Sequence, residues 1–374
     1  MTSEKQTQKA GDKSQLVQAG TINFYNNGID EKRAREICAE TYDIARKNFT
    51  ADAYACANER VQQFEDSLLP KIQKIDGALS AFADPSFQLL LTNAQRASIA
   101  TERTADYDML AELLVCRITK GQSRKNRAGI SRAVEIIDKI DDDALCALTV
   151  VYAVDKFIPM SVDCKEGLQA LNTMFDKLLY MDLPYGEDWM EHLDILDTIR
   201  ISPMTHFKKS NKYWPERLDG YSAAGIEIES DDYEKAIALL SEVGIDKRVL
   251  KPNEFLEGYV KLPVVNKDEI EKIHLIERSS TSGSIASISR QLNEKELSIL
   301  NSVWDLYTDD YVVTDKVKSE FMKLWDSYSA LEKIHKWRDS LSYAFVITHV
   351  GAVLAHTNAR RCDDSIPELP LIDG

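Results

Sequence analysis

Apolar side chains recur every three or four residues through the stretch between residues 31 and 181. This spacing places them on one face of successive helices. One stripe lies within residues 110–118 and is followed by Gly121, a residue type that favours the end of a helix. A similar stripe spans residues 168–179. The chain is therefore predicted to be mainly α, a multi-helical body with a short N-terminal β arm and a small mixed α/β middle region.

Changes in composition divide the chain into four predicted segments. Prolines and glycines become frequent after residue 182, which indicates irregular chain. Helical periodicity returns near residue 291, where Asn293 and Glu296 have the spacing of a capping box. A single long helix is predicted from about 330 to 361. The segments are a flexible arm with a short strand (1–30), a helical domain (31–181), an irregular mixed α/β region (182–290) and a C-terminal helical region with a short tail (291–374).

The chain of 374 residues is acidic, because 61 Asp and Glu residues outnumber 46 Lys and Arg residues and give a formal net charge of −15. Such a charge argues against a general nucleic-acid coat, which needs a basic surface. The N-terminus lacks the apolar run of a secretion signal. The longest apolar stretch, residues 341–355, is shorter than the roughly 20 residues of a membrane span. We therefore expect a cytoplasmic protein in which this stretch is a buried helix.

Motifs that would identify an enzyme are absent from the sequence. It contains no Walker A loop, G-x-G-x-x-G loop, G-x-S-x-G elbow or H-E-x-x-H pair. One acidic cluster has ligand types that suit a cation, and a solvated acidic face explains it equally well. We expect no metal and no cofactor, and the sequence favours a non-enzymatic role. The cluster consists of Glu187, Asp188, Glu191, His192 and Asp194.

Arg200 and His206 fit the R-x5-H spacing of one class of helical ribonucleases. In that class the arginine would stabilise the scissile phosphate and the histidine would protonate it. Pro203 lies between the two residues here, where that class has a helix-associated loop. The pair is the candidate catalytic site, and structural roles for both residues are the simpler alternative.

Two basic segments are candidates for binding an anion. The first, KGQSRKNRAGISR, lies between two predicted helices, and the second follows His206. Either could hold a phosphate, a nucleotide or RNA, and a solvent-facing loop is the simpler alternative for each. The candidate binding residues are Lys120, Arg124, Lys125, Arg127, Lys208 and Lys209.

The N-terminal segment VQAGTINFYNN alternates polar and apolar residues in the manner of a short β-strand. Its amide side chains suit strand addition between chains, and its V-Q-x-G core is similar to short amyloid-type signalling motifs. The strand could equally complete its own fold or that of a neighbouring subunit. The candidate assembly residues are Val17, Gln18, Gly20, Ile22 and Phe24.

Four segments together resemble the LPO/Vpar family of bacterial proteins. In chain order they are GDKSQLVQAGTINFYNNGI, ADPSFQLLLTNAQRA, YDMLAELLVCRI and ITHVGAVLAHTNARR. The resemblance covers roughly residues 11–155 and 291–361 and includes no catalytic motif. It implies a cytoplasmic, mostly helical protein in a family whose function is unassigned. The opening G-D-x-S pattern and its Q-A-G also resemble leaders of bacterial immune and stress proteins.

These observations lead to three hypotheses for function. The first is a non-enzymatic protein that oligomerises or binds a protein partner through its N-terminal arm, in bacterial antiphage defence or stress response. The second is a toxin-like effector that acts on RNA or nucleotides through Arg200, His206 and the neighbouring lysines. The third is a membrane-acting effector that uses the apolar stretch 341–355.

Overall fold

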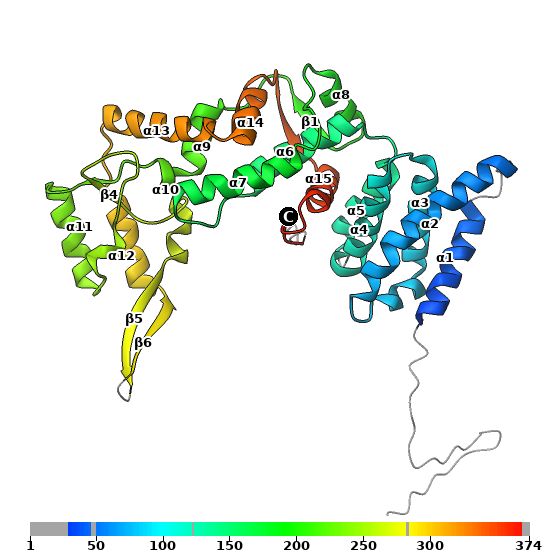
Figure 1. The fold of residues 1–374 in the computed structure, drawn as a ribbon, viewed down its shortest axis with the longest axis horizontal. Helices are drawn as coiled ribbons and strands as arrows, with labels where there is room; N and C mark the ends of the chain where they lie inside the picture. Colours follow the sequence, from blue (N-terminus) through cyan, green and yellow to red (C-terminus); the bar gives the residue numbers. More distant parts are fainter. Residues whose placement is uncertain (1–28, 46–49, 122, 282–283, 369–374) are drawn as a thin grey trace, which may run out of the picture.

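The chain forms an elongated arch of helices (Figure 1). The computed structural model describes residues 29–45, 50–121, 123–281 and 284–368. The predicted mainly helical character is confirmed. At one end of the arch lie α1 (Glu31–Ala45), α2 (Ala51–Gln73), the 3-10 helix η1 (Ala78–Ala83), α3 (Pro85–Ala100), α4 (Thr104–Lys120) and α5 (Arg124–Ile136).

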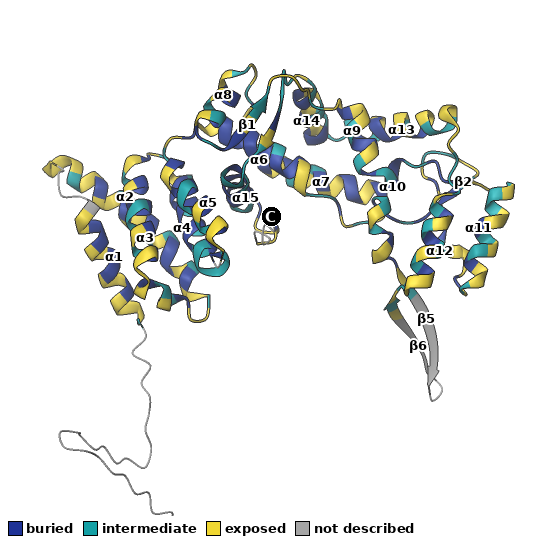
Figure 2. Ribbon diagram, turned by 180° about the vertical axis from the view of Figure 1, so that it is seen from behind, coloured by how far each residue is buried: buried dark blue, intermediate teal, exposed yellow. Residues whose placement is uncertain are grey.

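The apolar stripes predicted from the sequence form the core of this end. Leu110, Leu113 and Leu114 of α4 are fully buried, and Gly121 is the C-cap of that helix. Helix α4 packs against α2 and α5, and α1 packs against α3. Figure 2 shows the buried residues of these helices on the sides that face one another, with exposed residues on the outside.

Three further helices continue from this end into the middle of the arch. They are α6 (Asp142–Lys156), α7 (Cys164–Leu178) and α8 (Asp188–Ile195). Four helices adjoin them, and their buried tryptophans Trp214 and Trp325 stack with ring centroids 4.1 Å apart. These are α9 (Ser210–Arg217), α10 (Asp219–Ser222), α13 (Tyr311–Asp326) and α14 (Ser329–Asp339).

The far end of the arch has a smaller hydrophobic core of its own, which includes Ile226, Leu240, Leu262 and Leu300. It contains a three-stranded antiparallel sheet in the order β2-β4-β3 and a two-stranded hairpin, β5-β6. The strands are β2 (Ile226–Glu227), β3 (Lys251–Pro252), β4 (Tyr259–Lys261), β5 (His274–Thr281) and β6 (Ser284–Gln291). The helices are α11 (Asp231–Glu242), η2 (Lys247–Val249), η3 (Lys267–Lys272) and α12 (Glu294–Trp304).

The capping box predicted at the start of α12 is confirmed. The side chain of Asn293 accepts a hydrogen bond of 2.9 Å from the backbone N–H of Glu296. The Glu296 carboxylate in turn accepts one of 2.8 Å from the backbone N–H of Asn293. The reciprocal bonds satisfy two backbone donors that the helix itself cannot pair.

The single long helix predicted from about 330 to 361 is wrong. After α14 the chain forms β7 (Ala344–Ile347), and only then α15 (His349–Cys362). Strand β7 pairs antiparallel with β1 (Ile199–Ser202), so the aromatic and β-branched residues of the apolar stretch join a sheet, as such residues favour. The Thr348 side chain accepts a hydrogen bond from Gly351 N and starts a new helix.

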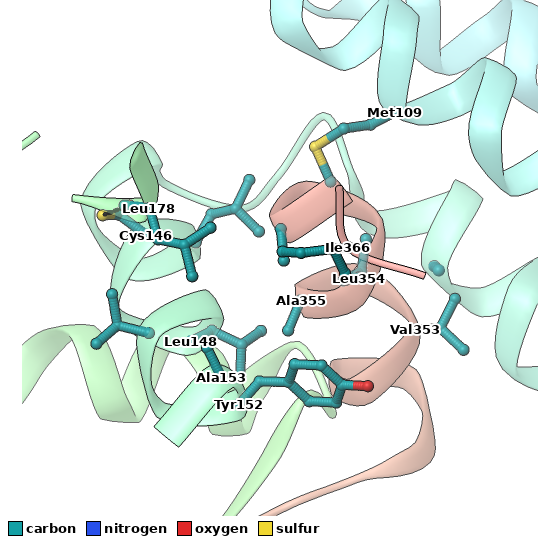
Figure 3. Packing of buried hydrophobic residues seen from close by; sticks show 14 of the residues in the cluster. Met109, Cys146, Leu148, Tyr152, Ala153, Leu178, Val353, Leu354, Ala355 and Ile366 are labelled. Atoms are coloured by element: carbon teal, nitrogen blue, oxygen red, sulfur yellow. Dashed lines mark hydrogen bonds between the residues drawn. The ribbon is translucent and has the colours of Figure 1, made fainter. Parts of the chain in front are cut away.

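Helix α15 packs against α4, α5, α6 and α7 and so joins the end of the chain to its middle. Leu354 and Ala355 are fully buried, and Figure 3 shows Ala355 on the side of Leu148 of α6 and Leu354 beside Ile366. The Asn358 amide donates to Thr149 Oγ1 at 2.9 Å and to the Tyr180 hydroxyl at 3.2 Å. One continuous core therefore includes helices from both halves of the sequence.

Residues 1–28, which hold most of the predicted β arm, lie outside the described part of the chain. Within the described ranges, none of the helices is both long enough and apolar enough to cross a membrane.

His356 of α15 is 2% exposed and bridges two parts of the core. Its Nδ1 lies 3.1 Å from the Tyr152 hydroxyl, and its Nε2 lies 3.0 Å from the Pro367 carbonyl oxygen. Burial disfavours the charged imidazolium and lowers the pKa of His356 to about 4.

We predict that His356 makes the fold acid-sensitive. In the unfolded chain the pKa of this histidine is about 6.5. Between about pH 6.5 and pH 4 its imidazole is therefore protonated in the unfolded state and neutral in the folded state. The free energy of unfolding should therefore fall as the pH falls from 7 to 5, by about 2 kcal/mol more in the natural protein than in a His356→Gln variant. Urea unfolding at both pH values measures the difference, and equal losses in the two proteins would contradict it.

Candidate functional site

A cavity of about 700 Å³ lies where the end of α6, the end of α14, strand β7 and the first turn of α15 meet. This volume is typical of sites for small molecules. Its apolar and aromatic lining includes Tyr152, Phe207, Tyr213, Phe345 and Ile347. Its charged and polar lining includes Lys125, Asp155, Lys156, Arg338, Thr348 and His349.

One end of the cavity, which we call the cationic end, is formed by Lys125, Thr348 and His349. Lys125 lies in the first turn of α5, and His349 in the first turn of α15 packs on Gly129, one turn further along α5, so the N-terminal part of each helix adjoins this end. The first turn of α5 contains no acidic residue, and among the described residues Lys125 has no ion-pair partner. The cationic end is thus built to attract an anion.

His349 is held at the cationic end by close packing. A Cβ atom added to Gly129 of α5 would lie 2.3 Å from its Cδ2 atom, so α5 approaches the ring because residue 129 is glycine. Both ring nitrogens are covered, and neither has a hydrogen-bond partner among the described residues. Burial and the neighbouring Lys125 both lower the pKa of His349. His349 therefore lines the cavity with its carbon atoms and backbone, and its covered ring nitrogens do not face the cavity.

The other end of the cavity, which we call the aromatic end, is formed by Phe207, Tyr213, Arg338 and Phe345. The Arg338 guanidinium carbon lies 4.1 Å from the centre of the Tyr213 ring and 5.3 Å from that of Phe207. Phe207 meets Phe345 edge to face at 5.2 Å. Arg338 is buried and donates to the Lys208 carbonyl oxygen. Among the described residues it has no carboxylate partner, an unusual position for a buried cation.

Negative groups lie at the aromatic end as well. The Tyr213 hydroxyl donates to the Val154 carbonyl oxygen at 3.3 Å, which places the C-terminal end of α6 beside the aromatic end. Asp155, next along α6, lines the cavity and pairs with Lys156 at 2.9 Å. The C-terminal end of a helix carries partial negative charge. The aromatic end therefore has a carboxylate near its guanidinium, whereas the cationic end has a lysine and, among its described residues, no carboxylate.

The four predicted binding residues of the first basic segment lie in different surroundings. Lys125 and Arg124 are both exposed, and of the two only Lys125 lines the cavity. Lys120 lies 3.8 Å from Glu368, and Arg127 donates to the Gly121 carbonyl oxygen. Of the four, only Lys125 is therefore brought to the cavity.

The second basic segment adjoins the opposite end of the same cavity. Lys208 pairs with Glu216 and accepts a hydrogen bond from Arg338 at its backbone carbonyl. Lys209 donates to the Asp339 carbonyl oxygen at 2.7 Å, at the end of α14. These lysines hold the wall of the aromatic end in place and do not line it.

Arg200 and His206 take part in separate contacts. Arg200 pairs with Asp197 at 2.6 Å and sits opposite Val346 in the β1-β7 pair. The Nδ1 atom of His206 lies 2.6 Å from the Ser342 carbonyl oxygen. Neither residue lines the cavity. Each has a hydrogen-bond or ion-pair partner of its own.

The acidic cluster around α8 is likewise engaged with the fold. Asp194 lies 3.7 Å from Arg200, and His192 accepts a hydrogen bond of 3.2 Å from the backbone N–H of Asp141. In the described ranges, no group of three or more potential metal ligands comes together. The candidate assembly residues lie outside the described residues, at Val17, Gln18, Gly20, Ile22 and Phe24.

Sequence reasoning missed Arg338 and His349 as site residues. Arg338 is one of several charged residues on α14, and its aromatic partners lie about 130 residues away along the chain. His349 could have been suspected, because it follows Thr348, a good N-cap residue. A histidine in the first turn of a helix opposes the dipole.

We predict that the packing of His349 on Gly129 makes any side chain larger than that of glycine unfavourable at position 129. A Gly129→Ala variant should lose about 1 to 3 kcal/mol of stability through overpacking, less the gain of about 1 kcal/mol that alanine brings to a helix. Removing the ring in a Gly129→Ala, His349→Ala double variant should recover the loss. Urea unfolding of both variants tests this, and a single variant more stable than the natural protein would contradict it.

Comparison with known proteins supports part of the resemblance seen in the sequence. A protein-family model matches residues 28–366, nearly the whole described chain. The match supports a Vpar-like family and gives no support to the LPO part of the family name. No curated protein and no solved structure matches the chain. The chain therefore belongs to a Vpar-like family.

Proposed function

We propose that this protein is a non-enzymatic binding protein whose cavity between α6, β7 and α15 takes a small organic anion. The observation that carries the proposal is the meeting of two helix N-termini, Lys125 and His349 at one end of an otherwise largely apolar cavity. Backbone N–H groups and the dipole at a helix start favour an anion. The aromatic lining favours a ligand with an apolar body.

The charge balance of the cavity supports the same proposal. Lys156 is offset by Asp155, which leaves Lys125 and Arg338 as cations without a carboxylate partner among the described residues. A protein with a formal charge of −15 repels anions at long range. The two cations without carboxylate partners therefore make the charge at this cavity opposite in sign to the net charge of the protein.

The toxin-like alternative places catalysis on Arg200 and His206. Their side chains are held by Asp197 and by the Ser342 carbonyl oxygen, on separate contacts. Catalysis on one phosphate requires both groups within hydrogen-bond reach of it. A binding role for the cavity is therefore the better supported proposal.

We predict that Lys125→Ala weakens binding of phenyl phosphate to the full-length protein by at least about tenfold, because a charge-assisted contact is lost. Arg124→Ala is the matched control, since both residues are exposed in the first turn of α5 and only Lys125 lines the cavity. That control should bind as the natural protein does. Isothermal titration calorimetry measures both affinities. Equal losses in the two variants would show a general charge effect and contradict the site.

Assembly through the N-terminal arm, in a bacterial defence or stress response, is a separate proposal that rests on the sequence alone. Alternating residues such as Ile22 and Phe24 suit strand addition. A shortened chain that starts at Gly28 should then be monomeric where the full chain is an oligomer. Light scattering gives both masses, and identical masses would contradict the proposal.

A further inference from the structure

The two ends of the cavity differ in chemistry and are separated along β7. Phe345, Val346 and Ile347 line the cavity between Arg338 on one side and His349 on the other. The first and last of the four strand residues lie roughly 10 Å apart, at about 3.3 Å per step. A ligand that fills the cavity therefore needs an anionic group at one end and a different group at the other.

The aromatic end suits a flat, hydrogen-bonding ring system. Arg338 stacks on Tyr213, and of its donors only the bond to the Lys208 carbonyl oxygen is made within the described residues. None of its nitrogen atoms is both covered and unpaired, so its remaining N–H groups face open space. Nucleic-acid bases stack on aromatic rings and on guanidinium planes, and they present acceptors to arginine.

The same end is unsuited to a second phosphate. Asp155 lines the cavity there, and the C-terminal carbonyl groups of α6 add partial negative charge. The Val154 and Asp155 carbonyl oxygens already accept from Tyr213 and Arg217, and the Asp155 carboxylate is the acceptor that an amino group of a base would meet. A polyphosphate or a longer nucleic acid would bring like charge against them.

We propose that the ligand of this cavity is a nucleoside monophosphate, with its phosphate beside Lys125 and His349 and its base beside Phe207, Tyr213 and Arg338. The proposal rests on the proposed anion-binding function and narrows it to one ligand class. It assigns the phosphate to the two helix N-termini and the base to the aromatic end. The cavity holds one phosphate and excludes a second.

The test is a series of titrations on the full-length natural protein. AMP should bind at least about tenfold more tightly than ribose 5-phosphate, because base stacking contributes that much or more. ATP should bind more weakly than AMP. Ribose 5-phosphate that binds as tightly as AMP, or ATP that binds more tightly, would overturn the nucleotide proposal.

The series also separates the two proposals. If phenyl phosphate binds with the expected dependence on Lys125 and AMP does not, the anion site stands and the nucleotide proposal is wrong. If none of these phosphates binds, both are wrong.

A Phe207→Leu variant tests the placement of the base. It should reduce the preference for AMP over ribose 5-phosphate several-fold and leave the affinity for ribose 5-phosphate unchanged. Equal losses for both ligands, in a variant whose thermal unfolding matches that of the natural protein, would overturn the assignment of the base to the aromatic end. Should the variant fold poorly, the titrations on the natural protein still decide the ligand class.

Discussion

The burial of α15 between the N-terminal helices and α6 is the interaction on which the rest of the structure depends. Val353, Leu354, Ala355 and Ala359 are almost completely buried, and complete burial of a large apolar side chain contributes about 1.5 to 3 kcal/mol. The close approach relies on small residues: a Cβ at Gly351 would lie 2.0 Å from the Thr198 carbonyl oxygen. Without this helix the first five helices would lose their main contact with the middle of the arch.

That packing also explains why the candidate site exists. Seating α15 against α5 brings two helix N-termini and the side chain of Lys125 to one place, which is electrostatically unfavourable without a counter-ion. Each helix-end interaction is worth about 0.3 to 1 kcal/mol, and an uncompensated buried ring nitrogen costs about 1 to 3 kcal/mol. These amounts are small beside the burial of α15. The burial of α15 therefore outweighs these unfavourable contributions.

The sequence predicted the parts of the fold that depend on local spacing. The stripe of α4 and the capping box of Asn293 and Glu296 are properties of neighbouring residues, and both are confirmed. Strand β7 was missed because its partner, β1, lies some 145 residues away, and a short apolar run has no periodicity that separates strand from helix.

The candidate site shows the same limit. The basic segment around Lys125 could be found as a charge pattern, which also pointed to Arg124 and Arg127. The cavity itself is assembled from α5, α6, α14, β7 and α15, and no local pattern reports which members of distant segments meet. Arg338 in particular is recognised as a site residue only through its contacts with the Tyr213 and Phe207 rings. A chain without a catalytic motif can still hold a binding site, because the site depends on tertiary packing.

The most direct test of the account is a crystal of the full-length protein soaked in sodium selenate, with anomalous data collected at the selenium edge. Selenate is an oxyanion like phosphate and can be located without ambiguity. We expect an anomalous peak at the cationic end, in contact with the first turn of α15, Lys125 and His349. An ordered selenate elsewhere on the protein, with none at this position, would contradict it.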